Sequence, residues 1–399
     1  MAYDTRNPDY TQASLTMITP FTHLGDLSVD EFMTDCWHKK PRLFRQAIAD
    51  FEPLCDLETI EEMASDEDIE SRLIQQQGQN WSLEKGPFEQ LPSLDRKHWT
   101  VLIQGIDHHL PEAYDLLQRF RFLPDARLDD VMLSLASDQG GVGPHFDSYD
   151  VFLLQMHGTR KWRIGPLVDA SLQENMPLKI LKNFQATEEF LLEPGDMLYL
   201  PPNYGHDGTA QGTCTTLSIG FRAPTKAEVL SGVLRDLADQ VDKDPALCNS
   251  LFADPDQLPT SIPAEIPQSM LEFGHVLMQQ FSPQSGAIGR SMGLLLSEPK
   301  PHVYFVNNTE DLEPDEIMQV LSERGVALSM KTKMLYSNGD IFINGDVVNP
   351  KEDLTVKQLQ MLANRRELEP EAAAKALKNP ELRYFLIGFA KAGWVETLV

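Results

Sequence analysis

The pattern of apolar and polar residues changes along the chain and marks three regions after a mixed N-terminal part. Between residues 131 and 222, short strand-like runs alternate with turns that contain Gly or Pro. Runs of this length, bounded by turn residues, predict β-strands. They are Val131–Ala136, Asp150–Gln155, Lys161–Ile164, Met197–Leu200 and Thr213–Arg222. Many short strands of this kind are typical of a double-sheet jelly roll or barrel.

A helical pattern follows the strands. Thr225 and Glu228 have the spacing of a capping box directly after Pro224, which predicts the start of a helix. The next apolar residues recur on one helical stripe: Leu230, Val233, Leu234, Leu237 and Val241. We therefore expect residues 225–298 to be helical. Such a stripe usually packs within its own chain, and a dimer interface is the alternative.

The last hundred residues combine helices with a small β-hairpin. Asn338–Gly339 separates two strand-like runs and is a strong hairpin signal. Helices are expected at 315–323, 356–363 and 382–390, so a winged-helix topology is predicted. Residues 300–399 carry 12 basic and 15 acidic residues, a net charge of 12 − 15 = −3. Because no basic stripe stands out, we expect a structural or protein-contact role and not DNA binding.

Composition narrows the choice of partners. The 399-residue chain has 34 basic and 60 acidic residues, for a net charge of −26. A surface this negative repels phosphate backbones, so nucleic acid is an unlikely partner, whereas a basic protein would be attracted. Asp50–Glu70 holds ten carboxylates and no basic residue, which predicts a solvated helix face or a docking surface.

Sorting signals and cysteines also limit the protein class. The sequence has no apolar run long enough for a membrane span and no apolar signal at its start, so a cytoplasmic protein is expected. None of the four cysteines forms a Cys-x-x-Cys pair, which argues against a zinc site or a disulfide framework.

The most informative chemistry lies in a Gly-rich turn and the strand after it. His145 and Asp147 are two residues apart, so on a strand both side chains point to one face. His206 follows a second strand that ends in Pro201–Pro202. Two His and one carboxylate form the facial triad of non-haem iron oxygenases. The residues alone leave a structural histidine as an alternative, and they do not exclude Mn, Co or Zn.

Three segments make a family resemblance specific. They are Gly140–Phe152 (GGVGPHFDSYDVF), Glu193–Pro202 (EPGDMLYLPP) and Ser218–Pro224 (SIGFRAP). Together they resemble the JmjC family of Fe(II)- and 2-oxoglutarate-dependent oxygenases. More narrowly, they resemble the bacterial ribosomal oxygenases that hydroxylate an arginine of a 50S ribosomal protein.

This resemblance extends over the whole chain and implies an architecture. The implied fold class is α+β, with a double-stranded β-helix core of the cupin or jelly-roll type. The domains would be an oxygenase domain with N-terminal helical and strand additions (1–224), a helical dimerisation segment (225–298) and a winged-helix-like domain (299–399). The resemblance implies a homodimer, a basic protein of the large ribosomal subunit as substrate, and no membrane association.

Metal and co-substrate residues follow by position. His145, Asp147 and His206 would be the Fe(II) ligands and the catalytic centre, with 2-oxoglutarate and O₂ as co-substrates. Arg160 stands where the family places the basic residue that holds the distal carboxylate of 2-oxoglutarate, and a guanidinium suits a carboxylate well. JmjC demethylases typically have Lys there, so Arg favours the ribosomal group.

Hydroxyl and acidic residues complete the candidate site. Ser134, Ser218 and Thr216 lie on core strands and are candidates for contacts to the co-substrate, although the resembled pattern has Asn where Thr216 stands. A guanidinium substrate needs an acidic or aromatic wall, for which Tyr149, Asp138 and Asp207 are the candidates.

Other functions stay open. One alternative is a JmjC histidine hydroxylase or lysine demethylase. A second is a non-catalytic cupin-like scaffold that binds a ribosomal protein through its acidic surface. A third is a winged-helix regulator, against which the acidic charge balance argues.

Overall fold

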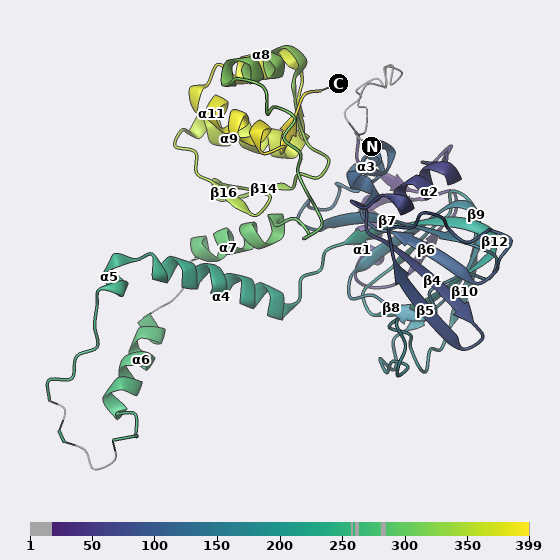
Figure 1. Cartoon of the computed structure of the whole chain (residues 1–399), viewed down its shortest axis with the longest axis horizontal. Helices are drawn as coiled ribbons and strands as arrows, with labels where there is room; N and C mark the ends of the chain where they lie inside the picture. Colours follow the sequence, from purple (N-terminus) through teal and green to yellow (C-terminus); the bar gives the residue numbers. More distant parts are fainter. Residues whose placement is uncertain (1–17, 257, 260–262, 281–284, 399) are drawn as a thin grey trace. The chain divides into compact units, whose positions relative to one another are not determined.

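The protein was examined as a computed structural model, which describes residues 18–256, 258–259, 263–280 and 285–398 (Figure 1). Parts of the expected domains that fall on other residues lie outside this description. The chain divides into two compact units, Met1–Ala223 and Pro224–Val399. They are called the N-terminal and C-terminal units below, and each has its own hydrophobic core.

The N-terminal unit opens with a hairpin and short helices. Its elements outside the main strands are β1 (His23–Leu24), β2 (Leu27–Ser28), α1 (Val29–Asp35), α2 (Leu57–Ser65), the 3₁₀ helix η1 (Ile106–His108) and α3 (Pro111–Gln118). The sequence spacing of Ser28 and Glu31 predicts a capping box at the start of α1, and the structure has it: Ser28 Oγ accepts from Glu31 N, and Glu31 Oε2 accepts from Ser28 N. Helix α2 buries Ile60 and Met63 and exposes its acidic residues. Much of the acidic run is therefore a solvated helix face.

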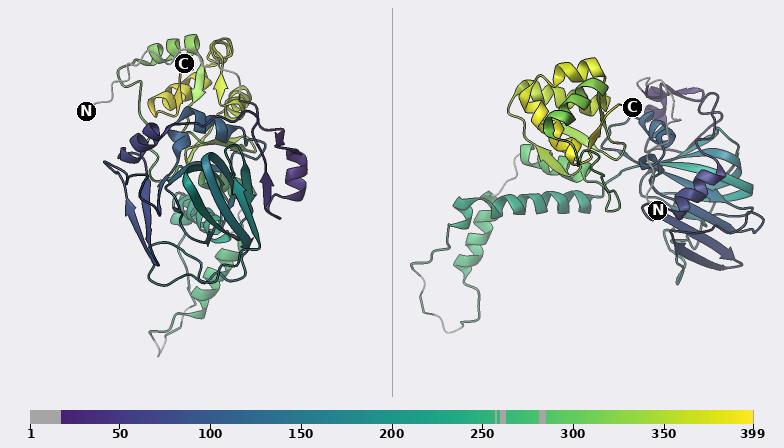
Figure 2. Two further views of the ribbon diagram at one scale, coloured as in Figure 1. Left: turned by 90° about the vertical axis from the view of Figure 1, so that its right-hand side faces the viewer. Right: turned by 45° about the horizontal axis from the view of Figure 1, so that its top comes forward.

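Ten antiparallel strands form the main sheet. They are β3 (Arg42–Phe44), β4 (Ser71–Gln77), β5 (Asn80–Lys85), β6 (Trp99–Ile103), β7 (Leu128–Ala136), β8 (His145–Phe146), β9 (Asp150–Pro166), β10 (Glu188–Leu192), β11 (Met197–Leu200) and β12 (Tyr204–Phe221). The pairing order is β3-β11-β9-β12-β7-β6-β4-β5, with β10 beside β9 and β8 beside β12. The long strands β9 and β12 are labelled in Figure 1, and Figure 2 shows the strands of this unit from two further directions.

Strands β9 and β12 each contribute to two layers. Residues 151–154 of β9 pair with β11, whereas residues 160–164 pair with β10. Likewise, residues 214–221 of β12 pair with β7, whereas residues 205–206 pair with β8. The register between β9 and β12 shifts between Gln211 and Thr216, as expected where strands bend between layers. This arrangement confirms the predicted double-stranded β-helix core.

The two faces of the larger layer differ in character. Val131, Leu133 and Leu135 of β7 point to one face, where they join a core that contains Phe32 of α1 and Ile60 of α2. Because side chains alternate along a strand, the residues between them point to the opposite face, toward the smaller layer. On that inner face Ser134 is buried, and Met132 and Leu102 are partly exposed. The inner face is where the predicted site residues gather.

The C-terminal unit begins with the expected helices. They are α4 (Lys226–Asp242), α5 (Pro245–Cys248), α6 (Gln268–Gln280) and α7 (Ser285–Ser297). The capping box of α4 is present, with Glu228 N donating to Thr225 Oγ1 at 3.1 Å. Leu230 and Leu234 of α4 are 59% and 54% exposed, although Val233 and Leu237 are buried. None of the described helices is long and apolar enough to cross a membrane.

The remaining elements form a winged helix, as predicted. They are α8 (Pro314–Arg324), β13 (Val326–Leu328), β14 (Met334–Ser337), β15 (Asp340–Ile343), β16 (Asp346–Val348), α9 (Asp353–Arg365), β17 (Glu367–Leu368), α10 (Pro370–Ala376), α11 (Pro380–Lys391) and β18 (Val395–Glu396). Strands β14 and β15 make the expected hairpin, with Asn338 and Gly339 at positive φ in the turn. Helix α7 contacts this wing, because a side chain at Gly293 would meet the ring of Phe342. The expected boundary at residue 298 remains a prediction.

We predict that Gly293→Ala destabilises the protein. A Cβ there would lie 2.3 Å from two ring carbons of Phe342, closer than packing allows. We expect the free energy of unfolding to fall by about 1–3 kcal/mol in urea titrations. Gly388→Ala in α11 is the matched control, because its Cβ meets nothing within 4 Å. It should stabilise that helix by up to about 1 kcal/mol, and equal effects of both changes would contradict the prediction.

Candidate active site

The pairing of β8 with β12 brings the two candidate histidines together. His145 is the cross-strand partner of His206, and their ring centroids are 4.1 Å apart. Asp147 follows two residues after His145, and its Oδ2 lies 3.6 Å from His206 Nε2. One ligand atom from each of the three residues lies within 4.8 Å of the others. The predicted triad therefore converges on one point.

Hydrogen bonds fix which ring nitrogen faces that point. Nδ1 of His145 lies 2.9 Å from Gly143 O, and Nδ1 of His206 lies 3.0 Å from Tyr204 O. Since a carbonyl oxygen only accepts, Nδ1 carries the proton and Nε2 is left as the lone-pair donor. Burial, followed by the nearby His145, holds the pKa of His206 well below its usual value. A neutral imidazole is the form that binds a metal ion.

Burial also raises the pKa of Asp147, against the opposing influence of His145 and a hydrogen bond from Tyr149. A divalent cation at the triad would reverse this cost by pairing with the carboxylate. The donor set, two neutral imidazoles and one carboxylate on one side, suits a first-row metal ion that keeps positions for further ligands. The residues therefore fit Fe(II).

Arg160 lies on β9 within the same layered core and is 5% exposed. Its Nη1 donates to Ser134 Oγ at 3.0 Å. Its Nε and Nη2 are buried and have no hydrogen-bond partner among the described residues, and neither does Nε1 of Trp162. A buried guanidinium with unmatched donors is costly unless an anion meets it. The arrangement fits the distal carboxylate of 2-oxoglutarate.

Serine and threonine candidates line the inner face near Arg160. Thr216 is the cross-strand partner of Ser134, and its Oγ1 donates to Gln155 Oε1 at 2.9 Å. Ser218 lies two residues further along, opposite Met132. Ser134 thus touches Arg160 directly, whereas Thr216 is engaged by Gln155. Their contacts to a co-substrate remain predictions.

On the other side of the triad, Tyr149 donates a hydrogen bond to Asp147. Burial, and then the carboxylates of Asp147, Asp130 and Asp129, raise the pKa of Tyr149. A Cβ at Gly220 would lie 3.5 Å from Asp130 Oδ1 and 3.9 Å from Tyr149 Cε2, so these two side chains flank the glycine. The sequence reasoning missed Asp130. Its place on β7, two residues before Met132 and four before Ser134, is the signal that assigns it to the inner face.

Asp138 and Asp207 have other partners. Asp138 forms an ion pair with Lys97 at 2.6 Å and accepts from Gly212 N, which lowers its pKa to about 2. Asp207 forms an ion pair with Arg163 and, as the neighbour of His206 on a strand, points to the opposite face. Both carboxylates are thus engaged by basic side chains, whereas Tyr149 contacts Asp147. The substrate contacts expected of all three residues remain predictions.

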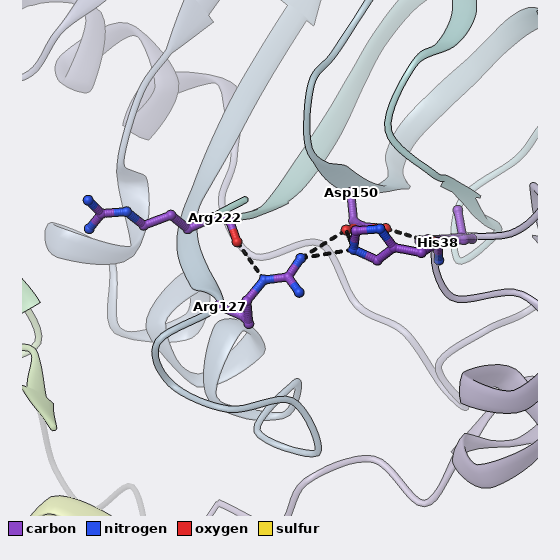
Figure 3. Close-up of polar contacts among 5 residues, drawn as sticks. His38, Arg127, Asp150 and Arg222 are labelled. Carbon is purple, nitrogen blue, oxygen red and sulfur yellow. Dashed lines mark hydrogen bonds and ion pairs between the residues drawn. The ribbon is translucent and has the colours of Figure 1, made fainter. Parts of the chain in front are cut away.

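A buried ionic cluster holds the start of β9, just after the residues of the site (Figure 3). Asp150 is fully buried and accepts from Tyr199 Oη at 2.6 Å. Its other oxygen lies 2.8 Å from His38 Nε2 and 3.1 Å from Arg127 Nη2. Arg127 Nε also donates to the carbonyl of Arg222 at 2.5 Å. This cluster fixes the backbone beside Tyr149 from the side opposite the site.

Comparison with known proteins agrees with this geometry. A family model for the JmjC domain matches residues 115–229, and one for a ROXA-like winged helix matches residues 277–396. The chain is 30% identical over 374 residues to the ribosomal protein uL16 3-hydroxylase of Escherichia coli K12, covering 92% of this chain and 97% of that protein. The chain belongs to the JmjC-domain ribosomal oxygenases. A probable ribosomal oxygenase of Haemophilus influenzae is 28% identical and covers 92% of this oxygenase and 94% of its own length.

Solved structures agree with the assignment. The X-ray structure of E. coli ycfD superposes with a TM-score of 0.82 at 28% identity, covering 94% of this oxygenase and all of that chain. Another structure, of YcfD as a ribosomal oxygenase with cobalt and 2-oxoglutarate, gives a TM-score of 0.79 over 94% of this chain. That relative was solved with cobalt and 2-oxoglutarate, which agrees with a site in this chain whose triad fits Fe(II) and whose Arg160 fits the co-substrate carboxylate.

The residues divide the chemical work between them. When bound, iron and the reducing co-substrate 2-oxoglutarate would activate O₂, the oxidant, for hydroxylation of a C–H bond. His145, Asp147 and His206 would hold the metal from one side. Arg160, with its unmatched Nε and Nη2, would anchor the far carboxylate and so orient the co-substrate. The buried apolar residues around Trp162 keep water away from this end.

We predict that Arg160→Met weakens binding of 2-oxoglutarate. Removing a charge-assisted pair from a buried site costs about 1.5–3 kcal/mol, which is roughly 10- to 150-fold in affinity. The KM for 2-oxoglutarate and its Kd for the Mn(II)-loaded protein should both rise by that factor. Lys161→Met, on the same strand but only partly buried, is the control and should leave both near wild type. An unchanged Kd in Arg160→Met would contradict the assignment.

Proposed function

We propose that this oxygenase hydroxylates an arginine side chain of a large-subunit ribosomal protein, with uL16 as the candidate substrate. The uL16 assignment rests on the name of the E. coli relative. The observation that supports arginine is the Asp130 carboxylate near Tyr149, the residue that donates a hydrogen bond to Asp147 of the candidate triad. A buried carboxylate next to an aromatic ring suits a planar cation that offers several N–H donors.

Local charge and space favour a guanidinium at this position. Asp129 and Asp130 both act electrostatically on Tyr149, so the field there is negative. Gly220 leaves room between Asp130 and Tyr149 that any larger residue would fill. A lysine or a protonated histidine could also meet a carboxylate, but only the guanidinium presents two parallel N–H donors to both oxygens.

The acidic balance of the protein agrees with a basic partner. The net charge of −26 would speed the encounter with a positively charged ribosomal protein. Acting on such a substrate would place the enzyme in the cytoplasm, where ribosomes are assembled and work.

The direct test is mass spectrometry of uL16 incubated with the enzyme, Fe(II) and 2-oxoglutarate. We expect a gain of one oxygen on an arginine, and Asp130→Asn should lower kcat/KM for uL16 by about 10- to 100-fold, the loss of a charged hydrogen-bond acceptor. 2-Oxoglutarate decay without uL16 should change little. Asp95→Asn, on an exposed turn, is the control. A gain of oxygen on histidine, or a loss of methyl from lysine, would establish the alternative activities instead.

We further propose a homodimer formed through the helical segment. Exposed apolar side chains gather on its helices and connections: Leu230, Leu234, Leu247, Leu251, Leu258, Ile266, Met270, Leu271, Phe273, Val276, Leu277 and Met278. So many large apolar side chains left exposed along one segment support a protein interface there. The same segment of a second copy would pack its apolar side chains against these, because a two-fold interface uses the same surface of both subunits.

For this proposal we predict that Leu230→Glu weakens the dimer. A carboxylate at an apolar interface loses its hydration without gaining a partner, which costs several kcal/mol per dimer. Sedimentation velocity at micromolar concentration should show a shift from about 90 kDa, twice the 45.0 kDa chain mass, toward the monomer. Leu354→Glu, a similarly exposed leucine of α9, should leave the mass unchanged. A wild-type monomer at these concentrations would refute the proposal.

A further inference from the structure

The carboxylate of Asp130 is held from behind by polar side chains of neighbouring strands. Gln104 follows β6 directly, and its Nε2 donates to Asp130 Oδ2. Arg72 of β4 donates from Nη2 to Gln104 Oε1 at 2.9 Å. Arg72 Nε lies 3.7 Å from Glu70 Oε1 at the edge of the sheet. These four residues are called the Gln104 relay.

Register shows that the relay crosses the inner face on the side of Tyr149. Arg72 is the cross-strand partner of Leu102, which is the partner of Ser134. The guanidinium of Arg72 reaches 4.0 Å from Met132 Sδ, so its side chain crosses from β4 over β6 toward β7. Gln104 N also donates to Glu70 O at 2.9 Å, which fixes the backbone from which Gln104 projects.

Chemistry dictates how the relay is oriented. An amide has one accepting oxygen and one donating nitrogen. Because Arg72 can only donate, it takes the oxygen of Gln104 and turns the Nε2 group toward Asp130. One oxygen of Asp130 is thereby held by Gln104, and the other, Oδ1, lies beside Gly220 and Tyr149. Arg72 therefore orients Gln104, and Gln104 in turn sets the direction in which the second oxygen of Asp130 points.

We propose that Gln104 and Arg72 are positioning residues that aim Asp130 at the substrate guanidinium and so determine substrate specificity. This inference rests on the proposed function. Two-point recognition of a planar cation requires a carboxylate at one angle, because both parallel N–H donors must align. Without Gln104, Asp130 loses the hydrogen bond at Oδ2 that orients its carboxylate. Neither residue touches the metal triad in the structure.

A double-mutant cycle tests whether Gln104 acts through Asp130. Gln104→Leu should raise the KM for uL16 about tenfold and leave uncoupled 2-oxoglutarate decay unchanged. In an Asp130→Ala background, Gln104→Leu should raise the KM by less than about twofold, because the carboxylate that Gln104 orients is gone. Arg72→Met should behave like Gln104→Leu, with partial recovery in Arg72→Lys. All KM values would be taken from the mass-spectrometric assay of hydroxylated uL16.

Gln75→Leu is the matched control, because Gln75 of β4 also donates to a carboxylate, that of Glu84 at 3.2 Å. It should leave the KM for uL16 near wild type. If the increases in KM caused by Gln104→Leu and Asp130→Ala are additive, the relay has only a structural role. The same conclusion follows if Gln75→Leu raises the KM as much as Gln104→Leu does. Either result would overturn this inference and leave the proposed function untouched. If the wild-type protein leaves uL16 unmodified, the proposed function fails and this inference fails with it.

Discussion

One antiparallel strand pair, β8 with β12, is the constraint on which the site depends. It places His145 opposite His206, and Asp147 joins them because it lies two residues further along the same segment. For this pairing, the turn before β8 must pass very close to neighbouring backbone. A Cβ at Gly140 would approach Trp99 O to 2.2 Å, and one at Gly141 would approach Gly208 O to 2.5 Å. The glycines before His145 are thus needed because other backbone passes too close for a side chain.

Buried charge is handled in two different ways in the N-terminal unit. Asp150 is surrounded by Tyr199, His38 and Arg127, so its charge is balanced within the protein. Arg160 is as deeply placed, yet it keeps two donors without a partner among the described residues. A cluster whose charges are paired within the protein stabilises the fold. A buried guanidinium with unmatched donors instead favours the binding of an anion that can accept from them. This difference distinguishes the Asp150 cluster, which supports the fold, from Arg160, which belongs to the candidate site.

Much of the fold was readable from the sequence because local signals agreed with the global structure. The capping boxes at Ser28 and Thr225 and the Asn338–Gly339 turn act within a few residues, so tertiary contacts cannot easily override them. The metal triad was also predictable, since a strand places residues two apart on one face and the resemblance assigned the distant His206. Arg160 followed from the same resemblance.

Other features depended on contacts between residues distant in sequence. Asp138 and Asp207 had the right chemistry, but Lys97 and Arg163 lie against them only in the folded chain. Asp130 was overlooked, because its neighbours Tyr149, Gly220 and Gln104 come from separate strands. Local periodicity shows which face of a strand a side chain occupies, and it says nothing about which strand lies beside it. The sequence alone therefore determined the elements, the triad and the chemistry available, whereas strand order and register decided which carboxylate lies beside Tyr149, because hydrogen bonds and ion pairs act only over a few ångströms.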